Sequence, residues 1–493
     1  MKTFHKHLAA ILLLAGILLV APTSAQAAER PLNVIVVLVD DLGWMDLSCQ
    51  GSDFYRTPNI DKLASSGMRF TNGYAACAVC SPTRAALMTG RYPGRLGITD
   101  WIRAEFQLGA RQGPNVKDAP EFHDGGKALI TPVNNMLLPH GEITLAELVK
   151  PLGYRSAFIG KWHLGGKGYL PTDQGFDLNF GGWDYGQPPS YFDPYTLGQR
   201  LPQGIPTLAP RKTGEYLTDR EGDEAVRFIR ANAGNSNAGD SNENAKPFLL
   251  YLAHYAVHTP IQGKKDLVAT YEALRDKKGQ DDPVYAAMVH SVDDAMGRLL
   301  ETLDELKLTE RTLIIFTGDN GGLDRQGRPT ENAPLRSGKG YAYEGGIRVP
   351  WIVRWPGVTR PGSVSNEPIS SIDLLPTVAA ALGTRPPADR PIDGIDLRPA
   401  LDGRFLPDRS LYWHFPHYRH GPGHDPYSII RDGDWKLIKF HDPPKVELYN
   451  LAEDLGERND LSKIQPGRAG VLESKLIQHL KTVGARMPKE KSI

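Results

Sequence analysis

Polar residues follow four apolar runs of this sequence, and their side chains suit a metal site with acid–base groups. The four groups are Asp40-Asp41 after 33–39, Lys161-Trp162-His163 after 155–160, His258 beyond 248–253 and Asp319-Asn320 beyond 312–317. Carboxylates and an amide oxygen are hard ligands, which suit Ca²⁺ or Mg²⁺ better than a metal that prefers thiolates. Taken alone, Asp40-Asp41 fits a surface turn with an Asp cap equally well.

A further motif, Cys80-Ser81-Pro82-Thr83-Arg84, places a cysteine where a helix is expected to begin. Pro82 suits the first turn, because the amide hydrogen that it lacks would have no partner there. Residues 85–88 then favour helix propagation. A side chain at a helix start faces free N–H groups and the positive end of the dipole, where an anion binds. The ordinary alternative is a buried, inert cysteine that caps the helix.

The apolar runs are typical of strands buried on both faces, and helical patterns at 144–150, 222–232 and 285–307 lie between them. Strands that alternate with helices predict a mostly parallel sheet. Ligands of such sheets bind outside the carboxyl ends of the strands. The sequence therefore predicts that one edge of the sheet gathers Asp40, Asp41, Lys161, His163, His258, Asp319 and Asn320.

The composition changes near residue 386, where Pro and Gly become dense and the apolar runs become short. Runs at 410–414, 427–431 and 435–440 predict an antiparallel sheet of short strands, and 470–483 predicts a final helix. We therefore expect a catalytic domain over 29–385 and a small α+β subdomain over 386–493.

The first 28 residues have the pattern of a secretory signal. Lys2 and Lys6 precede an apolar run at 9–21, and Ala25-Gln26-Ala27 resembles a cleavage site. No later run is long and apolar enough to span a bilayer. Lys+Arg and Asp+Glu both number 57 among the 493 residues, which argues against a polycation built for nucleic acid. We expect a periplasmic or secreted protein with no integral membrane segment after signal cleavage.

Two stretches are expected to form loops, a long one at 106–131 and a disordered, low-complexity one at 234–245. The chain has three cysteines, so one disulfide cannot use them all. Cys49 and Cys77 are left if Cys80 is chemically converted, and they either form a disulfide or stay free.

Six motifs recur in an order that resembles the formylglycine-dependent sulfatases of the alkaline phosphatase superfamily. They are D-D-x-G-W, C-S-P-T-R, G-K-W-H-L-G, H-T-P, T-G-D-N-G-G and G-K-G-x-x-Y-E-G-G-I-R-V-P. The resemblance covers most of the mature chain and continues into 431–438 and 447–451. It implies an α/β fold, namely the alkaline-phosphatase-like α/β/α sandwich with a mostly parallel sheet.

The resemblance also implies roles for single residues. Cys80 would be oxidised to formylglycine (3-oxoalanine) by a formylglycine-generating or anaerobic maturation enzyme, and its hydrate would attack sulfur. Arg84 and Lys161 would hold the hydrate, Lys339 and His258 would contact the sulfate, and His163 would act as a base. One Ca²⁺, or Mg²⁺, would be held by Asp40, Asp41, Asp319, Asn320 and residue 80, with no organic cofactor.

The substrate is expected to be an organic sulfate monoester, on a sulfated carbohydrate rather than a small aryl sulfate. Alternatives are an arylsulfatase, a phosphatase or phosphonate monoester hydrolase, and a silent glycan-binding protein with the same fold. An aromatic and basic tract at 413–421 either lines a sugar subsite or packs between domains. On the first reading, the substrate-binding candidates are Trp101, Arg103, His414 and His417. His254 is expected to pack in the core.

Overall fold

The computed structural model describes residues 31–107, 121–198, 201–209, 212–233, 246–274, 280–325, 328–419 and 425–491. The predicted signal segment 1–28 and the predicted loop at 234–245 lie outside these residues. Among the residues described, no helix combines the length and the apolar composition needed to cross a membrane.

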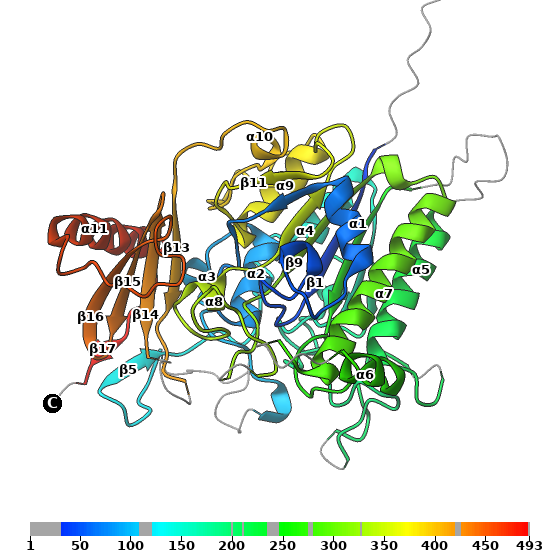
Figure 1. The fold of residues 1–493 in the computed structure, drawn as a ribbon, viewed down its shortest axis with the longest axis horizontal. Helices are drawn as coiled ribbons and strands as arrows, with labels where there is room; N and C mark the ends of the chain where they lie inside the picture. The colour runs from blue at the N-terminus through cyan, green and yellow to red at the C-terminus, as the bar shows by residue number, and fades with distance from the viewer. Residues whose placement is uncertain are drawn as a thin grey trace, which may run out of the picture. The chain divides into compact units, whose positions relative to one another are not determined.

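An eight-stranded sheet forms the core of the fold (Figure 1). In spatial order its strands are β11 (Ser363–Ser365), β2 (Met68–Phe70), β10 (Trp351–Arg354), β9 (Thr312–Gly318), β1 (Asn33–Val39), β8 (Phe248–His254), β6 (Arg155–Gly160) and β7 (Leu178–Phe180). β10 runs antiparallel to both of its neighbours, and the other neighbouring pairs are parallel. The prediction of a mostly parallel sheet is confirmed.

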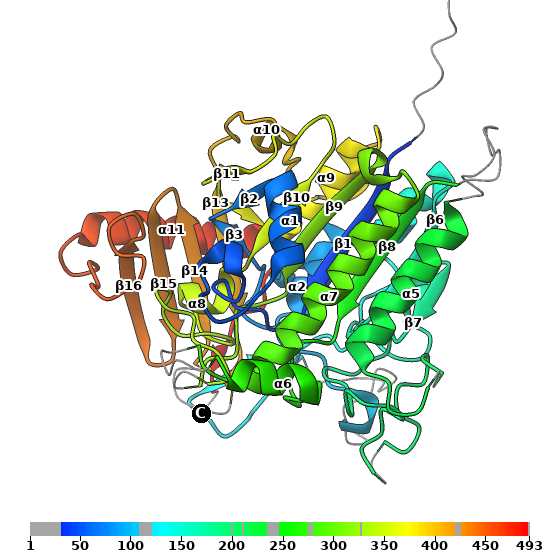
Figure 2. The same cartoon turned by 45° about the vertical axis from the view of Figure 1, so that its right-hand side comes forward.

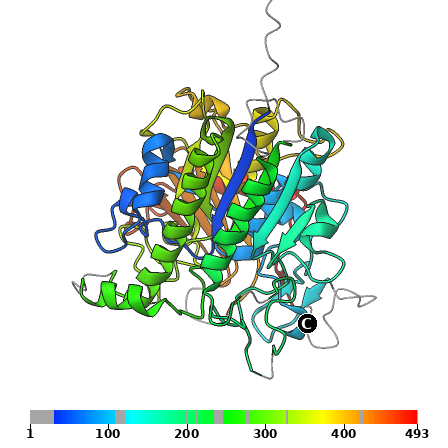
Figure 3. The same ribbon diagram turned by 90° about the vertical axis from the view of Figure 1, so that its right-hand side faces the viewer.

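Helices cover both faces of this sheet. Two of them, α5 (Leu217–Asn232) and α7 (Pro283–Glu305), run side by side along one face (Figures 2 and 3). The helices are α1 (Pro58–Ser66), α2 (Cys80–Thr89), α3 (Pro93–Leu96), α4 (Leu145–Val149), α5 (Leu217–Asn232), α6 (Lys265–Glu272), α7 (Pro283–Glu305), α8 (Glu344–Ile347), α9 (Leu374–Ala381), α10 (Arg398–Leu401) and α11 (Pro466–Thr482). Three predicted helices begin earlier than expected: α5 by five residues, α7 by two and α11 by four.

Alternate residues of β1 enter two separate apolar clusters, which is why the run is continuously apolar. Ile35 and Val37 pack in a cluster with residues of α1, α5 and α7. Val34 and Val36 pack in a cluster with residues of α2, α4 and α9. Because successive side chains of a strand point to opposite faces, both faces of β1 are buried and its ends are held rigidly.

A second, four-stranded antiparallel sheet follows in the C-terminal part (Figure 1). Its strands in order are β13 (Ser410–Phe415), β14 (Tyr427–Asp432), β15 (Trp435–His441) and β16 (Pro444–Asn450). One face packs on α11, and the other packs on the residues that precede α2 and on α8. The predicted antiparallel sheet is confirmed, with β16 as an additional strand, and the boundary at 385/386 stays a prediction.

Short strands occupy part of the stretch that was predicted to be a loop at 106–131. β4 (Phe122–His123) pairs with β5 (Leu129–Pro132), which also pairs with β17 (Lys489–Glu490). Residues 108–120 of this stretch lie outside the described residues. A further pair joins β3 (Gly73–Tyr74) to β12 (Ile369–Ser370). These strands are too short to show a period in the sequence.

A buried ion cluster joins the second sheet to the loop that carries α8. Lys436 of β15 lies 3.0 Å from Glu344 and 2.7 Å from Glu457, and the Lys436 and Glu344 side chains are fully buried. Glu457 also accepts a hydrogen bond from the Glu344 amide. Two carboxylates therefore share one ammonium group where water does not screen them.

We expect Lys436→Met to lower the free energy of unfolding by about 3–5 kcal/mol, because it leaves Glu457 without its buried cation and leaves Glu344 with Arg348 alone, at 3.4 Å. Urea unfolding measures this change. Lys439→Met on the same strand is the matched control, since the Lys439–Glu473 pair is about 30% exposed and such pairs contribute at most about 1 kcal/mol. Equal losses in the two variants would contradict the prediction.

Candidate active site

Cys80 is the first residue of α2, as the sequence predicts. The helix is buried along its whole length, and Thr83 anchors its start by hydrogen bonds to both backbone groups of Cys77. Burial raises the pKa of the Cys80 thiol, although Lys161 and Lys339 oppose this. The unmodified thiol is therefore protonated at neutral pH and is a weak nucleophile.

The register of two central strands brings three carboxylates together. β1 and β9 are parallel neighbours with Val39 opposite Gly318, so Asp40 and Asp319 leave the sheet side by side. Asp41 follows in the left-handed conformation (φ 58°), and its amide donates to Asp319 Oδ1 at 3.2 Å. Their positions result from strand pairing, which is the arrangement expected at the carboxyl edge of a parallel sheet.

The carboxylates have the properties of a site for a hard cation. Asp40, Asp41 and Asp319 are at most 1% exposed, and each offers an oxygen within 4.8 Å of the others. Three oxygens here are buried without a hydrogen-bond donor: Asp40 Oδ1, Asp41 Oδ2 and Asn320 Oδ1. Buried oxygens without a partner are unfavourable. A divalent cation with oxygen ligands fits them.

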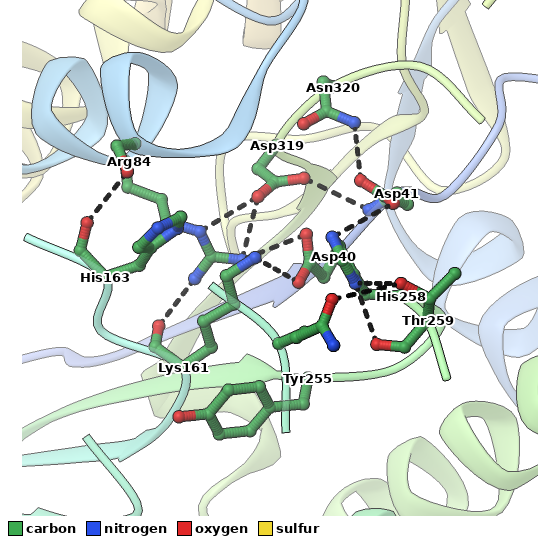
Figure 4. Close-up of polar contacts among 12 residues, drawn as sticks. Asp40, Asp41, Arg84, Lys161, His163, Tyr255, His258, Thr259, Asp319 and Asn320 are labelled. Carbon is green, nitrogen blue, oxygen red and sulfur yellow. Dashed lines mark hydrogen bonds and ion pairs between the residues drawn. The ribbon is translucent and has the colours of Figure 1, made fainter. Parts of the chain in front are cut away.

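Three buried or nearly buried cations hold the same carboxylates (Figure 4 draws the first two). Arg84 donates from Nε to Asp319 at 2.9 Å, and Lys161 Nζ lies 2.5 Å from Asp40 Oδ2. Lys339 Nζ lies 2.6 Å from Asp41 Oδ1. Burial would raise the pKa of Asp41, but the charge of Lys339 holds it well below its usual range. The site is thus a closely packed set of opposite charges.

His163 is held in one tautomer by a backbone carbonyl. Its Nε2 lies 2.5 Å from the carbonyl oxygen of Ile102, and because a carbonyl only accepts, Nε2 carries the proton. Nδ1 is therefore unprotonated, and it is buried with no hydrogen-bond partner. Burial, Lys161 and Arg84 lower the pKa of His163 well below its usual value. The ring is neutral and presents Nδ1 as a base.

His258 is neutral and lies beside the metal-site carboxylates (Figure 4). Its Nδ1 donates to the carbonyl of Thr259 at 2.9 Å, which leaves a lone pair on Nε2. Nε2 is 3.6 Å from Asp41 Oδ2. Burial and then Lys339 lower the pKa of His258 to about 3. The structure also groups ligand atoms of Asp40, Cys80 and His258 within 4.8 Å of one another.

The four substrate-binding candidates fall into two pairs. Trp101 and Arg103 flank Ile102, whose amide donates to Ser81 beside Cys80, and the Arg103 guanidinium lies 5.1 Å from the Trp101 ring. The two histidines are buried instead, and burial lowers their pKa to about 4 for His414 and about 3 for His417.

The bonds of these two histidines favour packing over substrate binding. Both ring nitrogens of His414 are engaged, by Ser428 at 2.8 Å and by the Arg486 carbonyl at 3.1 Å. His417 Nε2 lies 2.8 Å from Thr99 Oγ1. Both nitrogens of His414 are thus occupied in the structure, which favours the domain-packing alternative, while its role in substrate binding stays a prediction.

Other sequence expectations are settled by local contacts. His254 is buried at the end of β8, where its Nδ1 lies 2.7 Å from Glu221. It therefore sits in the core, with a polar partner that the sequence did not indicate. Cys49, Cys77 and Cys80 are all free thiols in this structure.

The family of this chain follows from a match over most of its length. The sulfatase family model matches residues 32–384. The chain belongs to the sulfatase family. A further model, described as N-sulphoglucosamine sulphohydrolase, C-terminal, matches residues 337–484 of this sulfatase. Family membership makes the protein a hydrolase of sulfate esters with the alkaline-phosphatase-like fold, as the motifs predict.

Relatives of this sulfatase include enzymes and proteins of solved structure. N-acetylgalactosamine-6-sulfatase of Canis lupus familiaris is 34% identical over 81% of this chain and 71% of the relative. A sulfatase of Formosa agariphila is 31% identical over 95% of this chain and 91% of the relative. The crystal structure of Ps i-CgsB aligns with a TM-score of 0.75 and 30% identity, over 92% of this chain and 93% of that one.

Gly186 packs against the imidazole of His163, which sequence reasoning missed because nothing in the sequence links the two positions. A Cβ at Gly186 would lie 2.9 Å from both Cε1 and Nε2 of the ring.

We expect Gly186→Ala to lower kcat by about tenfold to hundredfold, because the displaced ring loses its alignment. Steady-state sulfate release measures kcat. The control is Gly141→Ala, whose Cβ meets no atom within 4 Å, and an unchanged kcat for Gly186→Ala would refute the constraint.

Proposed function

We propose that this protein is an exported sulfatase that removes sulfate from a sulfated carbohydrate, through formylglycine made from Cys80 and with one bound Ca²⁺. The position of Cys80 carries the proposal. It begins a buried helix, within 4.8 Å of ligand atoms of Asp40 and His258. Its protonated thiol would be a weak nucleophile there, which favours conversion by a maturation enzyme. Export is supported by the signal pattern of residues 1–28.

The metal would be held by Asp40, Asp41, Asp319 and Asn320, together with the formylglycine oxygen. All are hard oxygen donors, so Ca²⁺ suits them and Mg²⁺ is the alternative. When bound, the cation would draw electron density from the sulfate oxygens and favour ionisation of the attacking hydroxyl. The unpartnered oxygens of Asp40, Asp41 and Asn320 support this assignment.

Formylglycine would supply a hydrated aldehyde, in which one hydroxyl attacks sulfur and the other permits release of sulfate. Arg84 and Lys161 orient this hydrate from the buried side of the site, where they already bind Asp319 and Asp40. His163 accepts a proton from the second hydroxyl at Nδ1, because the Ile102 carbonyl holds the proton on Nε2. A neutral histidine with a free Nδ1 is suited to that step.

Lys339 and His258 would act on the sulfate and on the leaving oxygen. Asp41 raises the pKa of Lys339 against the effect of burial, so Lys339 stays charged and binds an anion. His258 is neutral in the structure because burial and Lys339 lower its pKa. An anionic sulfate beside Lys339 would offset that charge and raise the pKa of His258, so that Nε2 gains a proton to donate to the ester oxygen.

The carbohydrate assignment rests on the residues beside Ile102 and on the relatives. Trp101 offers a flat apolar ring, which suits a sugar face. Arg103 makes no hydrogen bond or ion pair with any described residue. A guanidinium that has no such partner among the described residues and lies next to this ring favours a substrate with a second anionic group, such as another sulfate or a carboxylate. A structure of Ps i-CgsB holds k-i-k-neocarrahexaose, and it is 30% identical to this chain.

The proposal predicts an aldehyde or its hydrate at position 80 in protein from its native host. Mass spectrometry of the tryptic peptide tests this, together with sulfate release from sulfated sugars and an aryl sulfate. Cys80→Ala should lower turnover by at least about thousandfold, because the nucleophile is lost. Cys77→Ala, a buried thiol three positions away, is the control and should stay active. An intact thiol in protein that hydrolyses phosphate esters but no sulfate ester would refute the proposal.

Arg103→Ala should lower kcat/KM by about tenfold for a sugar sulfate with a neighbouring anionic group, because one charge-assisted hydrogen bond is lost. An aryl sulfate without a second anion is the internal control, and its kcat/KM should change little. Equal losses for the two substrates would show that Arg103 supports the structure and does not recognise a second anion.

A further inference from the structure

Asp46 is a fully buried carboxylate that no catalytic step uses. Its Oδ2 accepts hydrogen bonds from the Gly43 amide at 2.8 Å and from the Tyr285 hydroxyl at 2.5 Å. Its Oδ1 accepts from Thr330 Oγ1 at 2.7 Å and from Gln280 Nε2 at 3.2 Å. Four donors thus bind this carboxylate, one from its own turn and three from distant parts of the chain.

These bonds shape the turn that follows the metal acids Asp40 and Asp41. The Asp46 amide donates to the Gly43 carbonyl at 3.1 Å, so residues 43–46 form a closed turn. The Tyr285 hydroxyl that binds Asp46 also lies 3.3 Å from the Asp41 carbonyl. Gly43 has no room for a side chain, because a Cβ there would lie 2.7 Å from Asp46 Oδ2. Asp46, together with Tyr285, therefore fixes the backbone of the turn that follows Asp41.

Asn332 connects the two other loops of the site, the one that follows Asp319-Asn320 and the one that precedes Lys339. It is fully buried, and its Nδ2 donates to the carbonyls of Gly322 at 3.1 Å and Ser337 at 3.0 Å. Gly322 follows the Asp319-Asn320 pair, and Ser337 precedes Lys339. The Lys339 amide also donates to the Gly322 carbonyl at 3.0 Å.

The short segment 330–332 links the two connections, because Thr330 binds Asp46 and Asn332 binds the other loops. The loop that follows Asp41 and the loop that follows Asp319 also lie against each other, since a Cβ on Gly322 would lie 2.9 Å from the Gly43 Cα. Asp46, Thr330 and Asn332 together form what we call the polar hub. Three loops that carry Asp41, Asp319 and Lys339 thus meet at one buried set of hydrogen bonds.

We propose that Asp46 and Asn332 are positioning residues, which hold the three loops at the spacing that a divalent cation needs. The inference rests on the metal site of the proposed function. Arg84, Lys161 and Lys339 offset only part of the repulsion among the buried carboxylates when no divalent cation is bound, so without the hub the loops would separate. Loss of a group that orients metal ligands without touching the metal typically weakens metal binding by about tenfold to hundredfold.

Two isosteric substitutions test the proposal in the full-length protein stripped of metal. Asp46→Asn replaces one acceptor oxygen by an NH₂ group, so two of the four donors lose their partner. Asn332→Asp removes both donated bonds and places oxygen against carbonyl oxygen. Calorimetric titration with Ca²⁺ should show at least about tenfold weaker binding for each variant. Their sulfate release should recover at high Ca²⁺, which loss of folding would not permit.

Asp293→Asn is the matched control. Asp293 is also a buried carboxylate, and it accepts from the amides of Asn59 at 3.0 Å and Ile60 at 2.8 Å, where α1 begins. It touches none of the three loops in the contacts of the described residues. Asp293→Asn should lower the unfolding temperature of the metal-free protein and leave the Kd for Ca²⁺ unchanged.

The possible outcomes distinguish failure of the positioning role from failure of the proposed metal site. Unchanged Ca²⁺ binding in Asp46→Asn and Asn332→Asp, or an equal loss in Asp293→Asn, would overturn the positioning role. If the isosteric variants do not fold, Tyr285→Phe removes a single donor to Asp46 and should still weaken Ca²⁺ binding measurably. An unaltered protein that binds no Ca²⁺ or Mg²⁺ would overturn the metal site, and the inference with it.

Discussion

Three carboxylates confined in one small buried volume set the conditions for the rest of this structure. Asp40, Asp41 and Asp319 would repel one another strongly where water is excluded, and each would be costly to bury alone. Three cationic side chains from distant segments offset part of this charge. The oxygens that remain without a donor fit a divalent cation, and binding of one would couple metal affinity to the folding of this region.

Such a site requires a rigid frame, and the frame comes from both sheets. β1 is buried on both faces between two layers of helices, so the ends of β1 and β9 hold a fixed register. The C-terminal sheet packs against the residues that lead into α2 and against α8. Its Lys436 binds Glu344 of that short helix. The second sheet thus stabilises the segments that carry Cys80 and Lys339.

Much of the fold and most of the candidate site could be predicted, because the relevant signals are local. An apolar run that ends in acids predicts both a buried strand and its functional end, and a cysteine before proline predicts a helix start. The antiparallel direction of β10 could not be predicted, since four residues carry no mark of orientation. The sequence also left two roles open for the tract that contains His414, because the partners of His414, Ser428 and the Arg486 carbonyl, lie elsewhere in the chain.

The sequence by itself determined the chemical types available to this protein, namely the oxygen donors, the cysteine at the helix start, the cations and the histidines near strand ends. Only the tertiary structure decided how each is used. The tautomer of His163 depends on the Ile102 carbonyl, and the shape of the metal-site turn depends on Asp46 and its partners. The physical reason is that a hydrogen bond or a pKa shift is a property of a pair of groups, and folding alone brings those groups together.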